Sequence, residues 1–174
     1  QGLGYYSRCK NMLQTAQIIV NVFHGSFPTT YEDIIKLKGI GPYTAAAIAS
    51  FAFDLPYAVV DGNVIRILSR YFGIESPYQT SKEKKQFELL AQKLLPQKQS
   101  ADYNQAIMDL GATICKPQNP LCENCPFTKN CYAYINGRIS ELPVKKSKIV
   151  LKDRYFHFFI FENKTTFFFG FLFF

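Results

Sequence analysis

Apolar residues recur at intervals of three and four along most of the chain, which is the spacing of one face of an α-helix. The sequence therefore predicts amphipathic helices with the apolar stripes Leu13, Ala16, Val20 and Phe23; Val64, Ile67, Leu68 and Tyr71; Phe87, Leu90, Ala91 and Leu94; and Tyr103, Ile107, Leu110 and Ile114. Arg66 and Arg70 are expected on other faces of the second of these helices, and the last one delivers Cys115 at its C-terminus. No strand pattern precedes residue 150, so the fold class up to that point is all-α.

Two helix starts carry the spacing of a capping box, in which a hydroxyl and a carboxylate three residues later satisfy the first backbone N–H groups. Thr30 and Asp33 form such a pair before a short helix, and Thr80 and Glu83 form another before the third amphipathic helix. Pro96 ends that third helix, because proline cannot continue the hydrogen-bond pattern.

A stretch at residues 37–44 predicts the end of one helix, a tight turn and the start of another. Gly39 can adopt the positive φ that ends a helix, and Pro42 suits the first turn of the next one. Because Gly39 and Gly41 have no side chains, the N–H groups of the turn are unshielded, and such groups at a helix N-terminus bind anions, including DNA phosphates. An ordinary helical hairpin without a ligand is the alternative.

The composition changes near residue 150. A basic connector containing Lys145, Lys146, Lys148, Lys152 and Arg154 precedes two aromatic runs, at residues 155–161 and 165–169, with a turn between them. Two such runs predict a β-hairpin that opens a second domain. Residues 171–174 fit no clean pattern.

Composition narrows the class of protein. The chain has 174 residues, is 48% hydrophobic and has a formal net charge of +7, which favours a polyanionic partner. Neither a signal peptide nor an apolar run long enough for a membrane span is visible, so no membrane association is expected. The chain begins at Gln1 inside an apparent structured segment, so we expect it to be a piece of a longer protein.

Four of the five cysteines lie close together in the sequence. Cys115, Cys122, Cys125 and Cys131 are separated by six, two and five residues. In a chain without secretory features this clustering favours metal over disulfides. Zinc sites usually pair their ligands as two short knuckles, whereas only Cys122 and Cys125 form a close pair here, so one [4Fe-4S] cube fits better than zinc.

Asp61 precedes a predicted helix, so its ordinary role would be that of an N-cap. It also follows an apolar segment at residues 57–60 that should shield it. A fixed carboxylate in a dry pocket stabilises the positive sugar that forms when an N-glycosidic bond breaks. The base must first leave the DNA stack, which requires a firmly held backbone. The glycine hairpin and Asp61 together therefore suit a base-removing enzyme.

Residues 37–44, 60–64, 104–111 and the four cysteines together resemble the helix-hairpin-helix DNA glycosylases, and more narrowly the MutY family of adenine glycosylases. The resemblance covers about residues 1–145. It implies removal of adenine opposite 8-oxoguanine or guanine in duplex DNA during base-excision repair, a [4Fe-4S] cluster on the four cysteines, and a bacterial cytoplasmic, nucleoid-associated location. We expect a monomer.

Transferred position by position, the resemblance makes Asp61 the carboxylate that stabilises the oxocarbenium-like sugar, with Asn63 orienting it. Tyr43 stands where strand-cleaving relatives carry a nucleophilic lysine, which predicts hydrolysis without strand cleavage. Tyr5 matches the tyrosine that wedges beside 8-oxoguanine. The hairpin residues expected to contact DNA are Lys38, Gly39, Ile40, Gly41 and Thr44. The resemblance also implies a monovalent cation bound at the hairpin.

The resemblance also divides the chain and exposes departures from the family. We expect a helical domain at residues 1–114, the iron–sulfur loop at 115–132, a basic connector at 133–154 and the start of a Nudix-like β domain at 155–174. The family's catalytic glutamate lies upstream of Gln1, so this piece alone is expected to be inactive. The alternatives are an endonuclease III-like glycosylase/lyase acting on damaged pyrimidines and a non-catalytic, metal-stabilised DNA-binding module.

Overall fold

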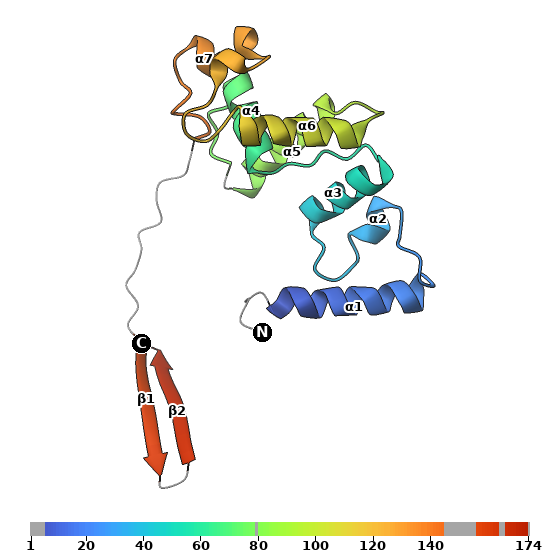
Figure 1. Ribbon diagram of the computed structural model, residues 1–174, viewed down its shortest axis with the longest axis vertical. Coiled ribbons are helices and arrows are strands. Elements are labelled where there is room, and N and C mark those ends of the chain that lie inside the picture. Colours follow the sequence, from blue (N-terminus) through green and yellow to red (C-terminus); the bar gives the residue numbers. More distant parts are fainter. Residues whose placement is uncertain (1–5, 79, 145–155, 164–165, 174) are drawn as a thin grey trace.

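The computed structural model describes residues 6–78, 80–144, 156–163 and 166–173. Its described helices are α1 (Tyr6–Val22), α2 (Tyr31–Ile34), α3 (Pro42–Phe53), α4 (Gly62–Phe72), α5 (Ser81–Leu94), α6 (Ser100–Thr113), the short 3-10 turns η1 (Cys122–Asn124) and η2 (Thr128–Asn130), and α7 (Tyr132–Ile135). Up to residue 144 the described chain is helical (Figure 1), which confirms the all-α prediction for that part.

The turn between α2 and α3 forms as the sequence predicts, although α2 is only one turn long. Thr30 caps α2 by accepting a hydrogen bond from the N–H of Asp33 at 3.3 Å. Gly39 has φ of +78°, and Pro42 is the first residue of α3. Local stereochemistry therefore sets both sides of this helical hairpin.

The described helices bury two separate apolar clusters. The first, the hairpin core, consists of Ile34, Ala45 and Ala49 from α2 and α3. The second, the α4–α5 core, consists of Val64, Ile65, Leu68, Phe87 and Ala91. An extended segment, residues 56–60, runs between the two clusters, with Tyr57 packed against the first and Ala58 and Val60 against the second.

Helix α4 is buried on nearly all sides, because α5, α6 and α7 all pack against it (Figure 1). Arg66 and Arg70, which the sequence placed on faces other than the apolar stripe, are both buried in the structure. Arg66 is 8% exposed and Arg70 is 4% exposed. Buried guanidinium groups require hydrogen-bond partners. Arg70 finds its partners in the chain that follows α6, whereas Arg66 bonds residues of α4 and α6 as well as the carbonyl of Cys115.

Two expectations fail in the described residues. Thr80 is the N-cap of α5, but its side chain makes no capping hydrogen bond, so the predicted capping box with Glu83 does not form. On α1, the predicted apolar stripe is not buried: Leu13 is 63% exposed and Val20 is 62% exposed. Helix α1 contacts the hairpin instead through Thr15, whose hydroxyl donates to the carbonyl of Lys38 at 3.0 Å.

The aromatic C-terminal runs form two antiparallel strands, β1 (Phe156–Asn163) and β2 (Thr166–Phe173), as predicted. Their register pairs Phe156 with Phe173 and Asn163 with Thr166. The second strand therefore includes residues 171–173, which showed no clear pattern in the sequence. Whether this hairpin begins a larger β domain stays a prediction.

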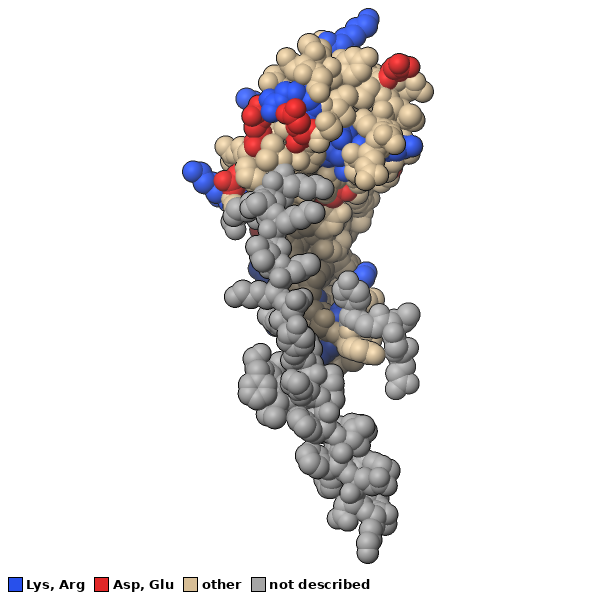
Figure 2. Space-filling view, turned by 90° about the vertical axis from the view of Figure 1, so that its left-hand side faces the viewer, with Lys and Arg blue, Asp and Glu red and all other residues tan. Residues whose placement is uncertain are grey.

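Charge is mixed on the described surface. On the face shown in Figure 2, acidic and basic side chains lie beside one another, and uncharged residues cover most of the area. Much of the chain's excess of lysine and arginine belongs to residues 145–154, which lie outside the described residues. Among the described helices, none has both the length and the apolar character that crossing a lipid bilayer requires.

Candidate functional site

The turn at Gly39 and Gly41 presents backbone to solvent at the N-terminus of α3. Gly41 is the N-cap of α3 and makes no side-chain capping bond, so the first N–H groups of this helix keep no partner from the cap. A Cβ built on Gly39 would lie 2.8 Å from the Cβ of Asn11, whereas one built on Gly41 would meet nothing within 4 Å. Gly39 is thus required for packing, and Gly41 leaves open space where an anion could approach.

The other predicted hairpin residues surround this turn. Lys38 and Thr44 are exposed, and Tyr43 is 45% exposed. Ile40 differs, because its apolar side chain is half-buried against the hairpin core. Tyr5, the predicted wedge residue, lies outside the described residues.

Asp61 is the N-cap of α4, and its carboxylate is held by two donors. Oδ1 accepts from the N–H of Val64 at 2.8 Å, and Oδ2 accepts from Nδ2 of Asn63 at 2.8 Å. Asn63 is fixed in turn, since its Oδ1 accepts from Arg66 at 2.7 Å. The structure therefore brings the predicted pair Asp61 and Asn63 together. Val64, Asn63 and Arg66 together set the orientation of the Asp61 carboxylate.

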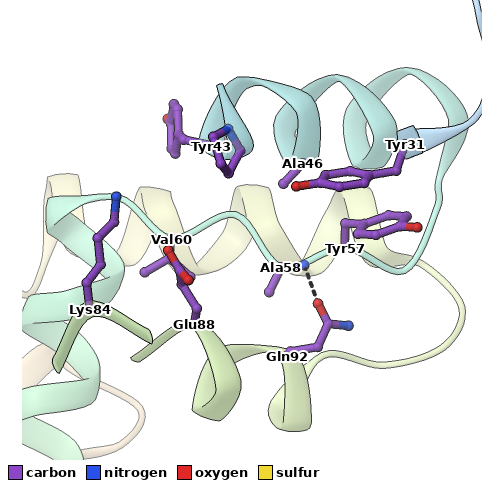
Figure 3. Close-up of a pocket in the computed structure, with 10 residues that line it drawn as sticks. Tyr31, Tyr43, Ala46, Tyr57, Ala58, Val60, Lys84, Glu88 and Gln92 are labelled. Carbon is purple, nitrogen blue, oxygen red and sulfur yellow. Dashed lines mark hydrogen bonds between the residues drawn. The ribbon is translucent and has the colours of Figure 1, made fainter. Parts of the chain in front are cut away.

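The hairpin and the segment that carries Asp61 border one cavity of about 140 Å³. Tyr43 lines it from the start of α3, Val60 from the residue before Asp61, and Lys84 and Glu88 from α5 (Figure 3). Tyr57 lines the same cavity and stacks on Tyr31, with ring centroids 4.4 Å apart. The exposed side chain of Tyr43 therefore lines the same cavity as Val60, the residue before Asp61.

The four clustered cysteines converge in space. Cys115 follows α6, Cys122 begins η1, Cys125 follows η1 and Cys131 precedes α7, and all four line a second, small cavity of about 30 Å³. All four are free thiols. Within the described residues, no three His, Cys, Asp or Glu side chains are close enough together to hold one metal ion.

Arg70 holds the cysteine loop to α4. Its guanidinium donates to the carbonyls of Lys116 at 2.8 Å, Pro117 at 3.2 Å and Leu142 at 3.0 Å, and to the sulfur of Cys115 at 3.3 Å. One buried cation thereby joins both ends of the loop and stands beside a thiol.

Arg66 connects the loop to Asp61 through Asn63. Its Nε donates to the carbonyl of Cys115 at 2.7 Å, and its terminal nitrogens bond Asn63 and the carbonyl of Gly111. A Cβ at Gly111 would lie 2.5 Å from the Cβ of Asn63, so a larger residue there would displace Asn63. This continuous set of contacts links the candidate carboxylate to the cysteine loop.

Burial shifts the pKa of two side chains among these contacts. It lowers the pKa of Arg66, although charge on Cys115 and Asp61 opposes the shift. Burial also raises the pKa of the Cys122 thiol, with Cys115 and Cys131 raising it further and Arg70 opposing them. Because metals bind thiolates, a cationic cluster in the cavity would have to displace protons from these thiols.

The sequence interpretation missed the most important polar residues around the site. Arg66 and Arg70 were expected on other faces of α4, and neither the exposed amide of Gln92 nor the buried amide of Asn104 was given a role. The one available signal was the pair of arginines, four residues apart on a helix whose other positions are mostly apolar. A lysine or arginine in such a helix is rarely buried without partners.

Comparison with known proteins agrees with this architecture. Residues 23–51 match the family described as the helix-hairpin-helix motif. An adenine DNA glycosylase from Buchnera aphidicola (Schizaphis graminum) is 39% identical over 166 residues, which cover 95% of this chain and 48% of the relative. An adenine DNA glycosylase from Rattus norvegicus is 45% identical over 146 residues, covering 82% of this chain and 28% of that protein.

Solved structures show the same fold. A thermostable thymine-DNA glycosylase superimposes with a TM-score of 0.67 at 35% identity, covering 74% of this chain and 59% of the other. A non-covalent endonuclease III–DNA complex superimposes with a TM-score of 0.63 at 25% identity, covering 78% of this chain and 61% of the other.

A glycine hairpin, an N-capping aspartate at the start of the next long helix and a four-cysteine loop, on a fold shared with these structures, place the chain in the helix-hairpin-helix superfamily of DNA glycosylases. Within that superfamily, the identity of 39–45% to proteins from bacteria and mammals shows that it belongs to the adenine DNA glycosylase, or MutY, family. The chain spans about half the length of the bacterial relatives.

Proposed function

We propose that this protein removes adenine mispaired with 8-oxoguanine or guanine from duplex DNA by hydrolysing its N-glycosidic bond. The observation that supports this most directly is the carboxylate of Asp61, which Val64 and Asn63 hold in place directly after Val60. Val60 lines the same cavity as the hairpin residue Tyr43. The similarity to adenine DNA glycosylases supports adenine as the base that is removed.

Each part of this arrangement has a physical task in base removal. The exposed N–H groups at the start of α3, with Lys38 and Thr44 nearby, would hold a backbone phosphate. A firmly held backbone stabilises a nucleotide that has left the base stack. Asp61 would then face the sugar as positive charge develops on it, which is where a preorganised negative group lowers the barrier most.

Tyr43 decides between hydrolysis and strand cleavage in this proposal. A lysine at that position would attack the sugar, form a Schiff base and allow the strand to break. A phenol cannot form that adduct, so the expected product is an intact strand with an abasic site. Sodium borohydride should therefore trap no covalent protein–DNA complex.

The four cysteines would bind a [4Fe-4S] cluster. The cluster would supply covalent cross-links among the end of α6, the η1 and η2 turns and the start of α7, and it takes no part in bond cleavage here. Iron analysis and absorption near 400 nm test this part of the proposal, with about four irons per chain as the expected content. A colourless protein that binds one zinc ion would contradict it. The monovalent cation at the hairpin stays a prediction.

The decisive experiment uses the full-length protein and a duplex that contains adenine opposite 8-oxoguanine. Replacing Asp61 with Asn should lower the single-turnover rate of adenine release by about a thousandfold, since a fixed charge at the developing cation is lost. DNA affinity should change little. Asp102→Asn, an exposed carboxylate in the first turn of α6, is the matched control and should keep the wild-type rate.

The same assay separates the competing functions. If adenine release survives Asp61→Asn, Asp61 is not catalytic; a wild-type protein that binds DNA but releases no base would instead be a non-catalytic module. An endonuclease III-like glycosylase/lyase is the second candidate, supported by superposition on endonuclease III–DNA complexes with TM-scores of 0.63 and 0.65. That function would show strand nicking and borohydride trapping on a thymine-glycol duplex.

A further inference from the structure

The extended segment at residues 56–60 leads directly to Asp61 and has no neighbouring strand in the described part of the chain. An extended backbone carries N–H and C=O groups on alternating sides, and when shielded from water each needs a partner. In this protein two side-chain amides, from Gln92 and Asn104, supply those partners.

Gln92 of α5 binds the segment from one side. Its Nε2 donates to the carbonyl of Pro56 at 2.7 Å, and its Oε1 accepts from the N–H of Ala58 at 3.0 Å, the bond drawn in Figure 3. A carboxamide offers one donor and one acceptor side by side, as a residue of a neighbouring strand would. Gln92 therefore stands in for a strand partner over residues 56–58.

Asn104 of α6 repeats this arrangement one residue further along. Its Nδ2 donates to the carbonyl of Tyr57 at 2.9 Å, and its Oδ1 accepts from the N–H of Val59 at 3.1 Å. Because successive residues of an extended chain present their polar groups to opposite sides, the two amides hold it from opposite flanks. Asn104 is 1% exposed and also donates to the hydroxyl of Ser50 on α3 at 2.8 Å.

The two amides fix the position of residues 56–59 along the chain direction relative to α5 and α6. Four consecutive residues, 56–59, are each held by one backbone group, and Asp61 follows two residues later. The segment also runs between the hairpin core and the α4–α5 core, so its position sets how far the hairpin stands from the carboxylate. Small displacements of a reacting group can cost large factors in rate.

We propose that Gln92 and Asn104 act together as an amide clamp whose task is to position Asp61 relative to the hairpin for base removal. This inference rests on the proposed function, in which Asp61 must meet a sugar whose phosphate the hairpin holds. Both are positioning residues in this proposal, since they act on Asp61 through the backbone. Gln92 also lines the cavity that Tyr43 and Val60 border, so DNA affinity is measured alongside the rate.

Gln92 is the residue to test, because it lies at the surface and its replacement leaves both apolar cores intact. In the full-length protein, Gln92→Leu removes both hydrogen bonds, and Gln92→Glu keeps only the acceptor for Ala58. Gln86→Leu is the matched control, because Gln86 is an exposed glutamine on the same helix. Asn104→Asp, which loses the donor to Tyr57, tests the other half of the clamp.

Three measurements on each variant distinguish positioning from general stabilisation. Amide hydrogen exchange should become faster at Ala58 in Gln92→Leu and stay unchanged in Gln86→Leu. The single-turnover rate of adenine release should fall about tenfold in Gln92→Leu and less in Gln92→Glu. Affinity for the uncleaved duplex should stay within about twofold, while affinity for a duplex carrying a cationic pyrrolidine in place of the sugar should fall in step with the rate.

The outcomes separate this proposal from the proposed function. Faster exchange at Ala58 with a wild-type rate of adenine release overturns the clamp and leaves the glycosylase proposal standing. Unchanged exchange in Gln92→Leu overturns it as well, because the amide then does not hold the segment. A wild-type protein that releases no adenine overturns the proposed function, and with it the catalytic purpose of the clamp.

Discussion

The hairpin region, residues 30–53, and the cysteine region, residues 114–144, are held in place by different forces. The hairpin region packs small apolar side chains, Ile34, Ala45 and Ala49, and its turn is shaped by backbone conformation at Gly39. The loop that carries the cysteines is instead tied to α4 by hydrogen bonds from Arg66 and Arg70 to backbone carbonyls.

This difference teaches where each region is sensitive. Apolar packing spreads its stabilisation over many weak contacts, so small conservative changes are tolerated. A buried guanidinium concentrates several hydrogen bonds on one side chain, and its removal leaves several acceptors unpaired at once. The cysteine region should therefore respond to single substitutions more strongly than the hairpin region does.

Removing Arg70 should give the largest loss of stability. Arg70→Met leaves the carbonyls of Lys116, Pro117 and Leu142 without this donor, and at about 1 kcal/mol each the free energy of unfolding should fall by roughly 3 kcal/mol. Chemical denaturation and iron content check this prediction, and both should decrease. Lys93→Met, at an exposed position on α5, is the control. An unchanged unfolding midpoint in Arg70→Met would remove the distinction between the two regions.

Substitutions at the two hairpin glycines should have smaller effects, one on stability and the other on DNA binding. Gly39→Ala combines a positive φ with a Cβ 2.8 Å from Asn11, so the free energy of unfolding should fall by about 1–2 kcal/mol. Gly41→Ala has open space and should leave stability nearly unchanged, while its methyl group weakens DNA binding at the turn. Thermal unfolding and DNA titration separate the two outcomes. Equal DNA affinity in wild type and Gly41→Ala would argue against phosphate binding there.

Substitutions at helix N-caps should cause the smallest losses of unfolding free energy, because each removes at most one hydrogen bond. Thr30→Ala removes the cap of α2 in the hairpin region and should cost about 1 kcal/mol of unfolding free energy. Thr80→Ala is a matched change at the N-cap of α5, where the hydroxyl makes no capping bond, and should cost much less. Urea denaturation of the two variants checks this, and equal losses would contradict the capping assignment.

The sequence predicted the hairpin better than its surroundings, and the residues explain why. Thr30, Gly39 and Pro42 act on the backbone within a few residues of themselves, so their effects follow from local stereochemistry. The interpretation failed at Thr80 and Glu83, where an equally good capping pattern forms no capping bond. The same pattern thus gave one right and one wrong prediction, because local signals set a preference that packing can override.

By itself the sequence determined the all-helical character up to residue 144, the glycine turn with its capped flanks, and the set of four cysteines, since periodicity, backbone preference and residue chemistry are properties of short stretches. Only the tertiary structure decided that Arg66 and Arg70 are buried and that two amides hold the segment before Asp61. Apart from Gly62 and Asn63, which lie on the same helix as Arg66, the partners of these side chains lie 34–72 residues away in the chain. Contacts over such separations arise from the packing of whole helices, which no local pattern encodes.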